Sequence, residues 1–122
     1  MDMNVTDGAE GVTQVALDGR FDIAGAQAVD ARFQELANSA KTLIVDLSKV
    51  TFIASLGVRT LMVGAKTMIR RGADMAVCGA DENVSKVLRS TGFNEIVGLY
   101  PDFASAAAVL KERRDEFENR KA

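Results

Sequence analysis

The chain has no histidine and only one cysteine among its 122 residues. The absence of histidine excludes Ser-His-Asp and Cys-His catalytic groups, phosphohistidine relays and imidazole ligands for a metal. A single cysteine excludes an internal disulfide and the cysteine clusters that hold zinc or iron–sulfur centres. We therefore expect a protein that has no catalytic residues, binds no metal or cofactor, and is not an enzyme.

Proline occurs once, at Pro101, and no stretch of the chain has the composition of a linker. A chain of this length is typical of one domain that buries its own core. No apolar run approaches the ~20 residues of a membrane span, and residues 1–4 lack the basic and apolar segments of a signal peptide. We expect a single cytoplasmic domain without membrane contact.

An excess of positive charge is also lacking. The net charge of −2 argues against binding to nucleic acid. The charge is distributed unevenly, because residues 1–47 hold eight acids and three bases, whereas residues 48–90 hold seven bases and three acids. The middle of the chain is therefore locally cationic inside an acidic protein.

The pattern of apolar residues predicts strands that alternate with helices. Strands are expected at residues 3–6, 12–17, 43–47, 75–79 and 96–100, and residues 50–54 form a short apolar connection. Helices are expected at residues 25–40, 56–71 and 83–90, and a last one begins after the capping residue Asp102. The order β-β-α-β-α-β-α-β-α indicates an α/β fold with one mixed sheet of about five strands.

Ser55 stands between a strand and the helix expected at residues 56–71. One interpretation is structural: its hydroxyl caps the first turn of that helix. The other is functional: the positive end of the helix and its unpaired N–H groups accommodate a phosphate on Ser55. Arg59, one turn further, is an additional partner for such a phosphate.

The helix after Ser55 has two unlike faces at 100° per residue. The stripe expected to face the core comprises Val58, Leu61, Met62, Ala65, Met68 and Ile69. The opposite face holds Leu56, Thr60, Val63 and Thr67, flanked by Arg59 and Arg70. Apolar residues on an outer face indicate a docking surface, although single exposed apolar residues are also common on ordinary surfaces.

Three segments carry a resemblance to a known family. Residues 43–58, with the sequence LIVDLSKVTFIASLGV, resemble the central motif of STAS domains, specifically of bacterial anti-sigma factor antagonists. Residues 19–22 (GRFD) resemble the turn after the second strand of that family, and residues 89–96 (RSTGFNEI) resemble the segment before its last strand. The resemblance covers residues 2–112, and it implies helices packed mainly on one face of the sheet. Residues 113–122 are expected to be a charged helix end that frays.

The resemblance implies a non-catalytic switch. In that family the unphosphorylated antagonist binds an anti-sigma factor, which is often a serine kinase that uses its own ATP to phosphorylate the antagonist. A serine phosphatase then resets the switch. Ser55 matches the phosphorylated serine, and Asp22 and Asp46 match polar positions near the site. The residues expected to contact the partner are Asp22, Leu56, Gly57, Arg59, Thr60, Val63, Thr67 and Arg70.

The motif departs from the family at the residues beside the serine. The family has Asp before it and Ser or Thr after it, whereas this chain has Ala54 and Leu56. The change leaves Ser55 as the only acceptor in the loop and removes an acid that orients the hydroxyl. An alternative function therefore stays open: a component of a larger assembly, such as a lipid-transport complex or a signalling scaffold, that works without phosphorylation.

Overall fold

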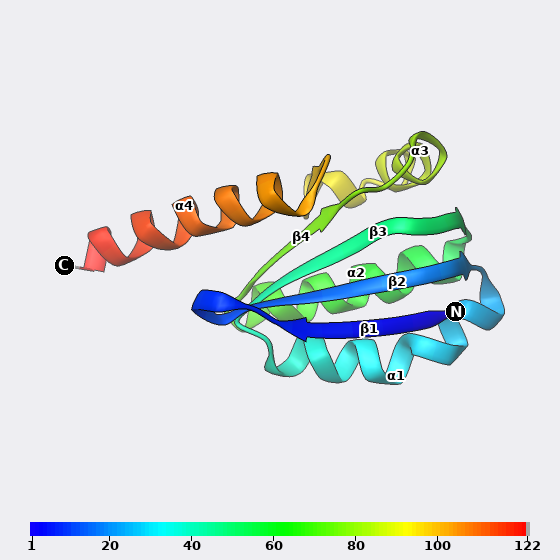
Figure 1. Ribbon diagram of the computed structural model, residues 1–122, viewed down its shortest axis with the longest axis horizontal. Helices are drawn as coiled ribbons and strands as arrows, with labels where there is room; N and C mark the ends of the chain where they lie inside the picture. Colours follow the sequence, from blue (N-terminus) through cyan, green and yellow to red (C-terminus); the bar gives the residue numbers. More distant parts are fainter. Residues whose placement is uncertain (122) are drawn as a thin grey trace.

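A computed structural model describes residues 1–121, which form one five-stranded sheet and four α-helices (Figure 1). The strands are β1 (Asp2–Asp7), β2 (Val12–Phe21), β3 (Thr42–Ile53), β4 (Asp74–Cys78) and β5 (Gly98–Tyr100). The helices are α1 (Ile23–Ser39), α2 (Ser55–Arg70), α3 (Glu82–Ser90) and α4 (Phe103–Lys121), with 3-10 turns at Ala9–Gly11 and Phe93–Glu95. No helix within residues 1–121 is long and apolar enough to span a bilayer.

The sheet has the order β1-β2-β3-β4-β5. β1 and β2 form an antiparallel hairpin, and each later neighbouring pair is parallel and is joined through a helix. Parallel neighbours require such crossovers, which place helices on the faces of the sheet. The predicted α/β class, the mixed sheet of five strands and the order of the elements are confirmed.

Alternating side chains on the central strands build two cores. Leu43 and Val45 of β3 face the larger core, which is covered by α1, α2 and α3, while Ile44 faces the other side. There Ile44 packs with Ala76 and Cys78 of β4 against Ala106 and Leu110 of α4. This alternation follows from the pleat of a strand, which points successive side chains to opposite faces.

Three strand boundaries differ from the prediction by two residues or more. β2 does not end at residue 17 but continues to Phe21. Residues 50–53 are not a connection but the end of β3, because Val50 and Ile53 pair with Gly19 and Phe21 of β2. β5 begins only at Gly98, since Phe93–Glu95 is a 3-10 turn. The longer β3 places the start of α2 directly beside the end of β2.

α4 continues beyond the predicted domain limit at residue 112. Its Arg114 donates hydrogen bonds to the carbonyl of Glu10 and to Thr42 Oγ1, so the helix is attached there to the 3-10 turn at Ala9–Gly11 and to the first residue of β3. The helix runs to Lys121, and Ala122 lies outside the described residues; the fraying of this end stays a prediction.

Two glycines of α2 set its close approach to neighbouring elements. A Cβ atom on Gly64 would lie 2.5 Å from Cε2 of Phe33 on α1, and one on Gly57 would lie 2.7 Å from the carbonyl oxygen of Phe21. The Ala54 N–H donates to that same carbonyl at 2.9 Å. These contacts fix the first turn of α2 against the end of β2, and they hold α2 close to α1.

Candidate functional site

Ser55 is the first residue of α2, and its side chain is exposed. The N-cap is Ala54, whose extended backbone (φ −104°, ψ 171°) precedes the helix and which supplies no capping side chain. The interpretation of Ser55 as a cap is therefore wrong by one residue. Among the described side chains, none forms a hydrogen bond with its hydroxyl, so the oxygen is accessible for chemistry.

The surroundings of Ser55 are electropositive. The first-turn N–H groups of a helix have no partner within the helix, and an alanine at the N-cap gives them no side-chain acceptor. α2 contains no acidic residue along its whole length. A negative charge on the Ser55 oxygen would therefore be stabilised by the end of this helix.

Arg59 lies one turn from Ser55, and both line a hollow of about 480 Å³ together with Ile23, Ala54 and Leu56. Arg59 is exposed, and no carboxylate of the described chain lies within ion-pair distance of it. Its guanidinium is therefore free to meet an anion in that hollow. Ile23, 62% exposed, was missed in the sequence, because it looks like a buried residue at the start of a helix.

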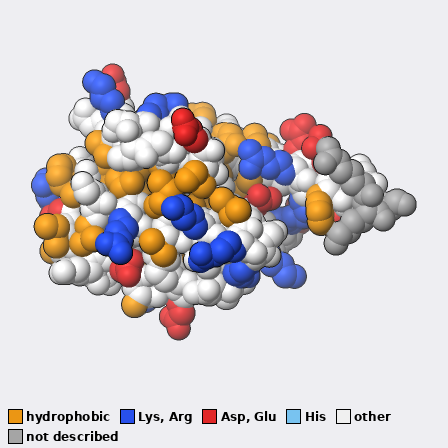
Figure 2. Space-filling view, turned by 180° about the vertical axis from the view of Figure 1, so that it is seen from behind, with side chains coloured by type: hydrophobic (Ala, Val, Ile, Leu, Met, Phe, Trp, Pro, Cys, Tyr) orange, Lys and Arg blue, Asp and Glu red, His pale blue; other side chains and the backbone are white. Residues whose placement is uncertain are grey.

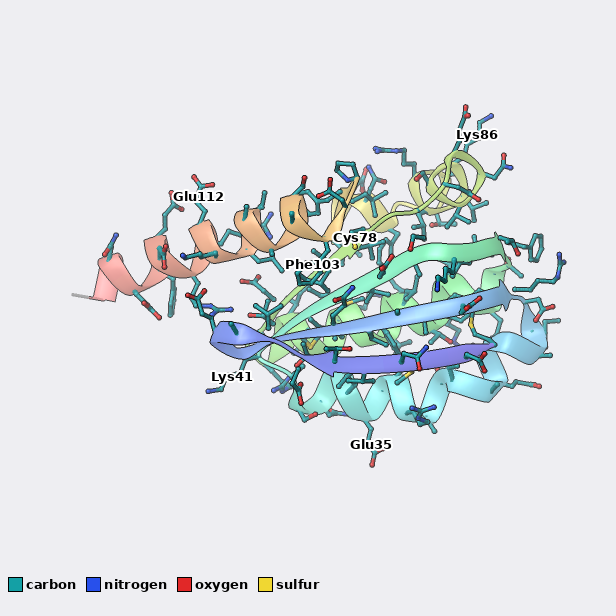
Figure 3. The ribbon with its side chains drawn as sticks, viewed as in Figure 1. Glu35, Lys41, Cys78, Lys86, Phe103 and Glu112 are labelled. Atoms are coloured by element: carbon teal, nitrogen blue, oxygen red, sulfur yellow. The ribbon has the colours of Figure 1, made fainter. Side chains whose placement is uncertain are left out.

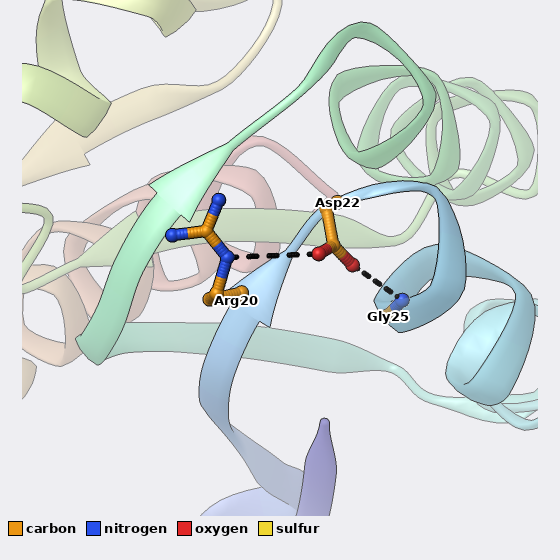
Figure 4. A network of polar contacts seen from close by, with 3 residues as sticks. All are labelled: Arg20, Asp22 and Gly25. Atoms are coloured by element: carbon orange, nitrogen blue, oxygen red, sulfur yellow. Dashed lines mark hydrogen bonds and ion pairs between the residues drawn. The ribbon is translucent and has the colours of Figure 1, made fainter.

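Asp22 caps α1 beside the site (Figure 4). Its Oδ1 accepts the Gly25 N–H at 2.8 Å, and its Oδ2 lies 3.6 Å from Nε of Arg20. The Gly25 hydrogen bond is the main cause that lowers the pKa of the Asp22 carboxyl, and Arg20 lowers it further. The Arg20 guanidinium also stacks 4.5 Å from the centre of the Phe52 ring, which is 40% exposed. Asp22 is thus a charged, positioned group at the rim of the site.

The outer face of α2 is rotated from the predicted one. Arg59, Val63 and Arg70 are exposed as expected, with Leu56 and Thr67 half-buried. The placement of Thr60 on this face is wrong, because its side chain is 4% exposed, and Gly57 is buried as well. Two residues predicted to face the core do not lie fully in it, since Ile69 is 53% exposed and Met62 is half-buried. Lys66 is exposed on the outer face, where the sequence analysis did not place it. The exposed face differs from the predicted one because α2 packs on α1 as well as on the sheet. These two contacts bury the small residues of α2.

Thr60 belongs to a polar cluster between α1 and α2. Its hydroxyl donates to Oδ1 of Asp30 at 3.1 Å. The Gln34 side-chain amide donates to the same Oδ1 at 3.2 Å and to the Thr60 carbonyl at 3.0 Å. Thr60 therefore helps to position the carboxylate of Asp30.

Asp46 does not lie near Ser55, so the expectation that it does is wrong. It accepts hydrogen bonds from the Ser48 N–H at 2.9 Å and from Gln14 Nε2 at 3.5 Å. It precedes Ile53 by seven residues of one strand, or about 20 Å at the rise of an extended chain. Asp46 therefore makes its contacts within β3 and with β2, away from the start of α2.

Cys78 is buried beneath α4 (Figure 3). Burial, with a smaller contribution from the charge of Asp46, raises the pKa of its thiol to about 11. We expect the native thiol to react with DTNB at pH 8 at least about 100-fold more slowly than in denaturant, because the thiolate is scarce and covered. Since this is the only cysteine, equal rates in the native and denatured protein would show that it is accessible.

Comparisons with known proteins match this architecture. The STAS domain family matches residues 3–106. A candidate anti-sigma factor antagonist, BtrV of Bordetella bronchiseptica, is 24% identical over 106 residues, which cover 86% of this chain and 91% of BtrV. An anti-sigma factor antagonist from Mycobacterium paratuberculosis superposes with a TM-score of 0.81 at 24% identity, covering 90% of this chain and 93% of that one.

A second similar structure comes from a transporter. The STAS domain of a SulP transporter from Vibrio cholerae is 30% identical and superposes with a TM-score of 0.65. The match covers 85% of this chain and 83% of that domain. From the extent of the family match and the shared fold, the chain belongs to the STAS domain family.

Proposed function

We propose that this chain is an anti-sigma factor antagonist, a non-catalytic partner-switching protein of the cytoplasm. In this proposal it binds an anti-sigma factor of the serine-kinase type and releases it when Ser55 is phosphorylated. The observation that carries the proposal is the Ser55 hydroxyl, which is exposed and forms no hydrogen bond with a described side chain. It lies at the positive end of α2, a helix that contains no acidic residue. The named relatives BtrV and the mycobacterial protein support the assignment.

The docking surface in this proposal is the outer face of α2, which we call the α2 stripe. It consists of Ser55, Arg59, Val63, Lys66, Ile69 and Arg70. Figure 2, viewed from behind the face of Figure 1, shows hydrophobic side chains gathered beside Lys and Arg side chains. Val63 and Ile69 are 42% and 53% exposed, so the α2 stripe combines apolar contacts with positive charge. Asp22, Leu56 and Thr67 flank it and complete the proposed contact.

The charges of the α2 stripe indicate the chemistry of the partner. The stripe carries Arg59, Lys66 and Arg70, and α2 has no acid to balance them. Complementary interfaces place opposite charges against each other. The partner surface is therefore expected to be apolar and acidic.

Phosphorylation would reverse this complementarity at one end. The kinase transfers the γ-phosphoryl group of its ATP to the Ser55 oxygen, the hydroxyl proton leaves, and ADP is released. The product carries a charge of about −2 on the positive end of α2. This charge repels an acidic partner and attracts the guanidinium of Arg59, one turn away. A serine phosphatase restores the hydroxyl by hydrolysis.

The test is to incubate the purified chain with its anti-sigma factor and ATP and to locate the phosphate by mass spectrometry. We expect one phosphoryl group, on Ser55, and none on the Ser55→Ala variant. Thr51, which is exposed two residues before the end of β3, serves as the internal control for kinase selectivity. Phosphate on another residue, or none under conditions in which the partner binds, would contradict the proposal.

A second function has a specific observation in its favour. Ala54 replaces the acid that precedes the serine in the antagonists this chain resembles, and a transporter STAS domain is 30% identical. The chain would then use the α2 stripe in a permanent assembly without phosphorylation. Mass spectrometry of the protein purified from its own cells separates the two, since the absence of phosphoserine under every growth condition favours the assembly.

A further inference from the structure

A groove of about 520 Å³ runs between α1 and α2, directly beside the α2 stripe. Its walls include the half-buried Leu56 and the exposed Val63, and Asp30 and Gln34 of α1 line the opposite side. Arg59 lines both this groove and the hollow around Ser55. The groove is therefore continuous with the proposed docking surface, although no residue pattern in the sequence indicates it.

Arg59 supplies a cation where the groove adjoins the hollow around Ser55, whereas Asp30 and Gln34 present acceptors on the α1 wall. The hydroxyl of Thr60 and the side-chain amide of Gln34 already donate to Oδ1 of Asp30, and the Gln34 amide also donates to the Thr60 carbonyl. Oδ2 of Asp30 and Oε1 of Gln34 accept no hydrogen bond from any side chain described, and Asp30 has no ion-pair partner there. A ligand that reaches the α1 wall must therefore supply hydrogen-bond donors there, and the Asp30 carboxylate favours a cation at that point.

The walls suit the stem of a long basic side chain. Lys and Arg bury their methylene groups on apolar surface while the charged end reaches a polar group. Leu56 and Val63 provide that apolar surface, and Asp30 provides the charge. We propose that the groove receives a Lys or Arg side chain of the anti-sigma factor, whose charged end binds Oδ2 of Asp30. This inference rests on the proposed function.

A second copy of the chain fits this surface less well. Two molecules joined through their α2 stripes would bring Arg59, Lys66 and Arg70 against the same residues of the other copy, and like charges facing each other are unfavourable. A different protein with an acidic, apolar surface around one basic side chain satisfies both the α2 stripe and the groove. The partner's basic side chain would thus fix the register of docking.

The Asp30→Asn variant tests the proposal, because asparagine keeps a carbonyl oxygen for Thr60 and Gln34 and replaces Oδ2 with an NH₂ group. We expect its affinity for the anti-sigma factor, measured by calorimetry, to fall at least about tenfold. The matched control is Glu35→Gln, which removes the same charge from α1 at a residue that projects away from the molecule (Figure 3). The control should bind like the wild type.

Three outcomes are distinguishable in the same titrations. An Asp30→Asn affinity within about twofold of wild type, with Ser55 still phosphorylated, overturns the groove alone. Equal losses in Asp30→Asn and Glu35→Gln also overturn it, because they indicate a general charge effect. If the wild-type chain binds no anti-sigma factor, the proposed function fails and the groove inference fails with it.

Discussion

Replacing Ser55 with aspartate should lower the affinity for the anti-sigma factor at least about tenfold, which corresponds to about 1.4 kcal/mol. The new carboxylate adds one negative charge where the proposed partner surface is acidic, at the edge of the α2 stripe. The fold should remain intact, because residue 55 is exposed and an acid in the first turn of a helix is favourable. Calorimetry gives the affinity, and chemical denaturation gives the free energy of unfolding.

Two controls separate charge from shape and position in this experiment. Ser55→Asn has nearly the size of the aspartate variant without its charge, so it should bind much more tightly than Ser55→Asp. Ser48→Asp places the same charge at an exposed residue of β3 outside the α2 stripe and should bind like wild type. If Ser55→Asp bound as tightly as the wild type, charge at this position would not control the interaction.

Replacing Gly57 with alanine should destabilise the protein by about 1–3 kcal/mol, the usual cost of forcing an atom into a packed site. The new Cβ would lie 2.7 Å from the carbonyl oxygen of Phe21 and 2.9 Å from Cγ of its ring. Phe21 is completely buried, so neither group has room to retreat. The start of α2 must therefore shift, and partner binding should weaken as well.

The comparison variant for Gly57→Ala is Gly8→Ala. Gly8 has an ordinary backbone conformation (φ −105°), and a Cβ there would meet only the Val12 carbonyl oxygen, at 3.3 Å. Its loss of stability, read from the same denaturation curves, should be clearly smaller. Equal losses for the two variants would mean that the contact between α2 and the end of β2 does not fix the site.

The sequence predicted the elements of this fold well because their apolar patterns are local. The sequence predicts a strand at residues 43–47, and the structure places them in the central strand of the sheet. The start of α2 was misplaced by one residue, since what sets it is the hydrogen bond from Ala54 to Phe21, more than 30 residues away in the chain. Such a contact leaves no local pattern.

The candidate site was predicted less completely than the fold. The sequence pattern predicts one buried side for a helix on a sheet, whereas α2 also packs on Phe33 of α1 through Gly64. That second contact buries Thr60 and exposes Ile69, which reverses two assignments. The groove at Asp30 depends on the spacing of two helices, and no residue pattern in either helix alone reports that spacing.

The most direct test of the account compares the chain before and after authentic phosphorylation. The chain is phosphorylated by its anti-sigma factor kinase, purified, and titrated by calorimetry into fresh anti-sigma factor beside the unmodified chain. We expect measurable binding of the unmodified chain and loss of binding once Ser55 carries the phosphate. Equal dissociation constants for the two forms would contradict it.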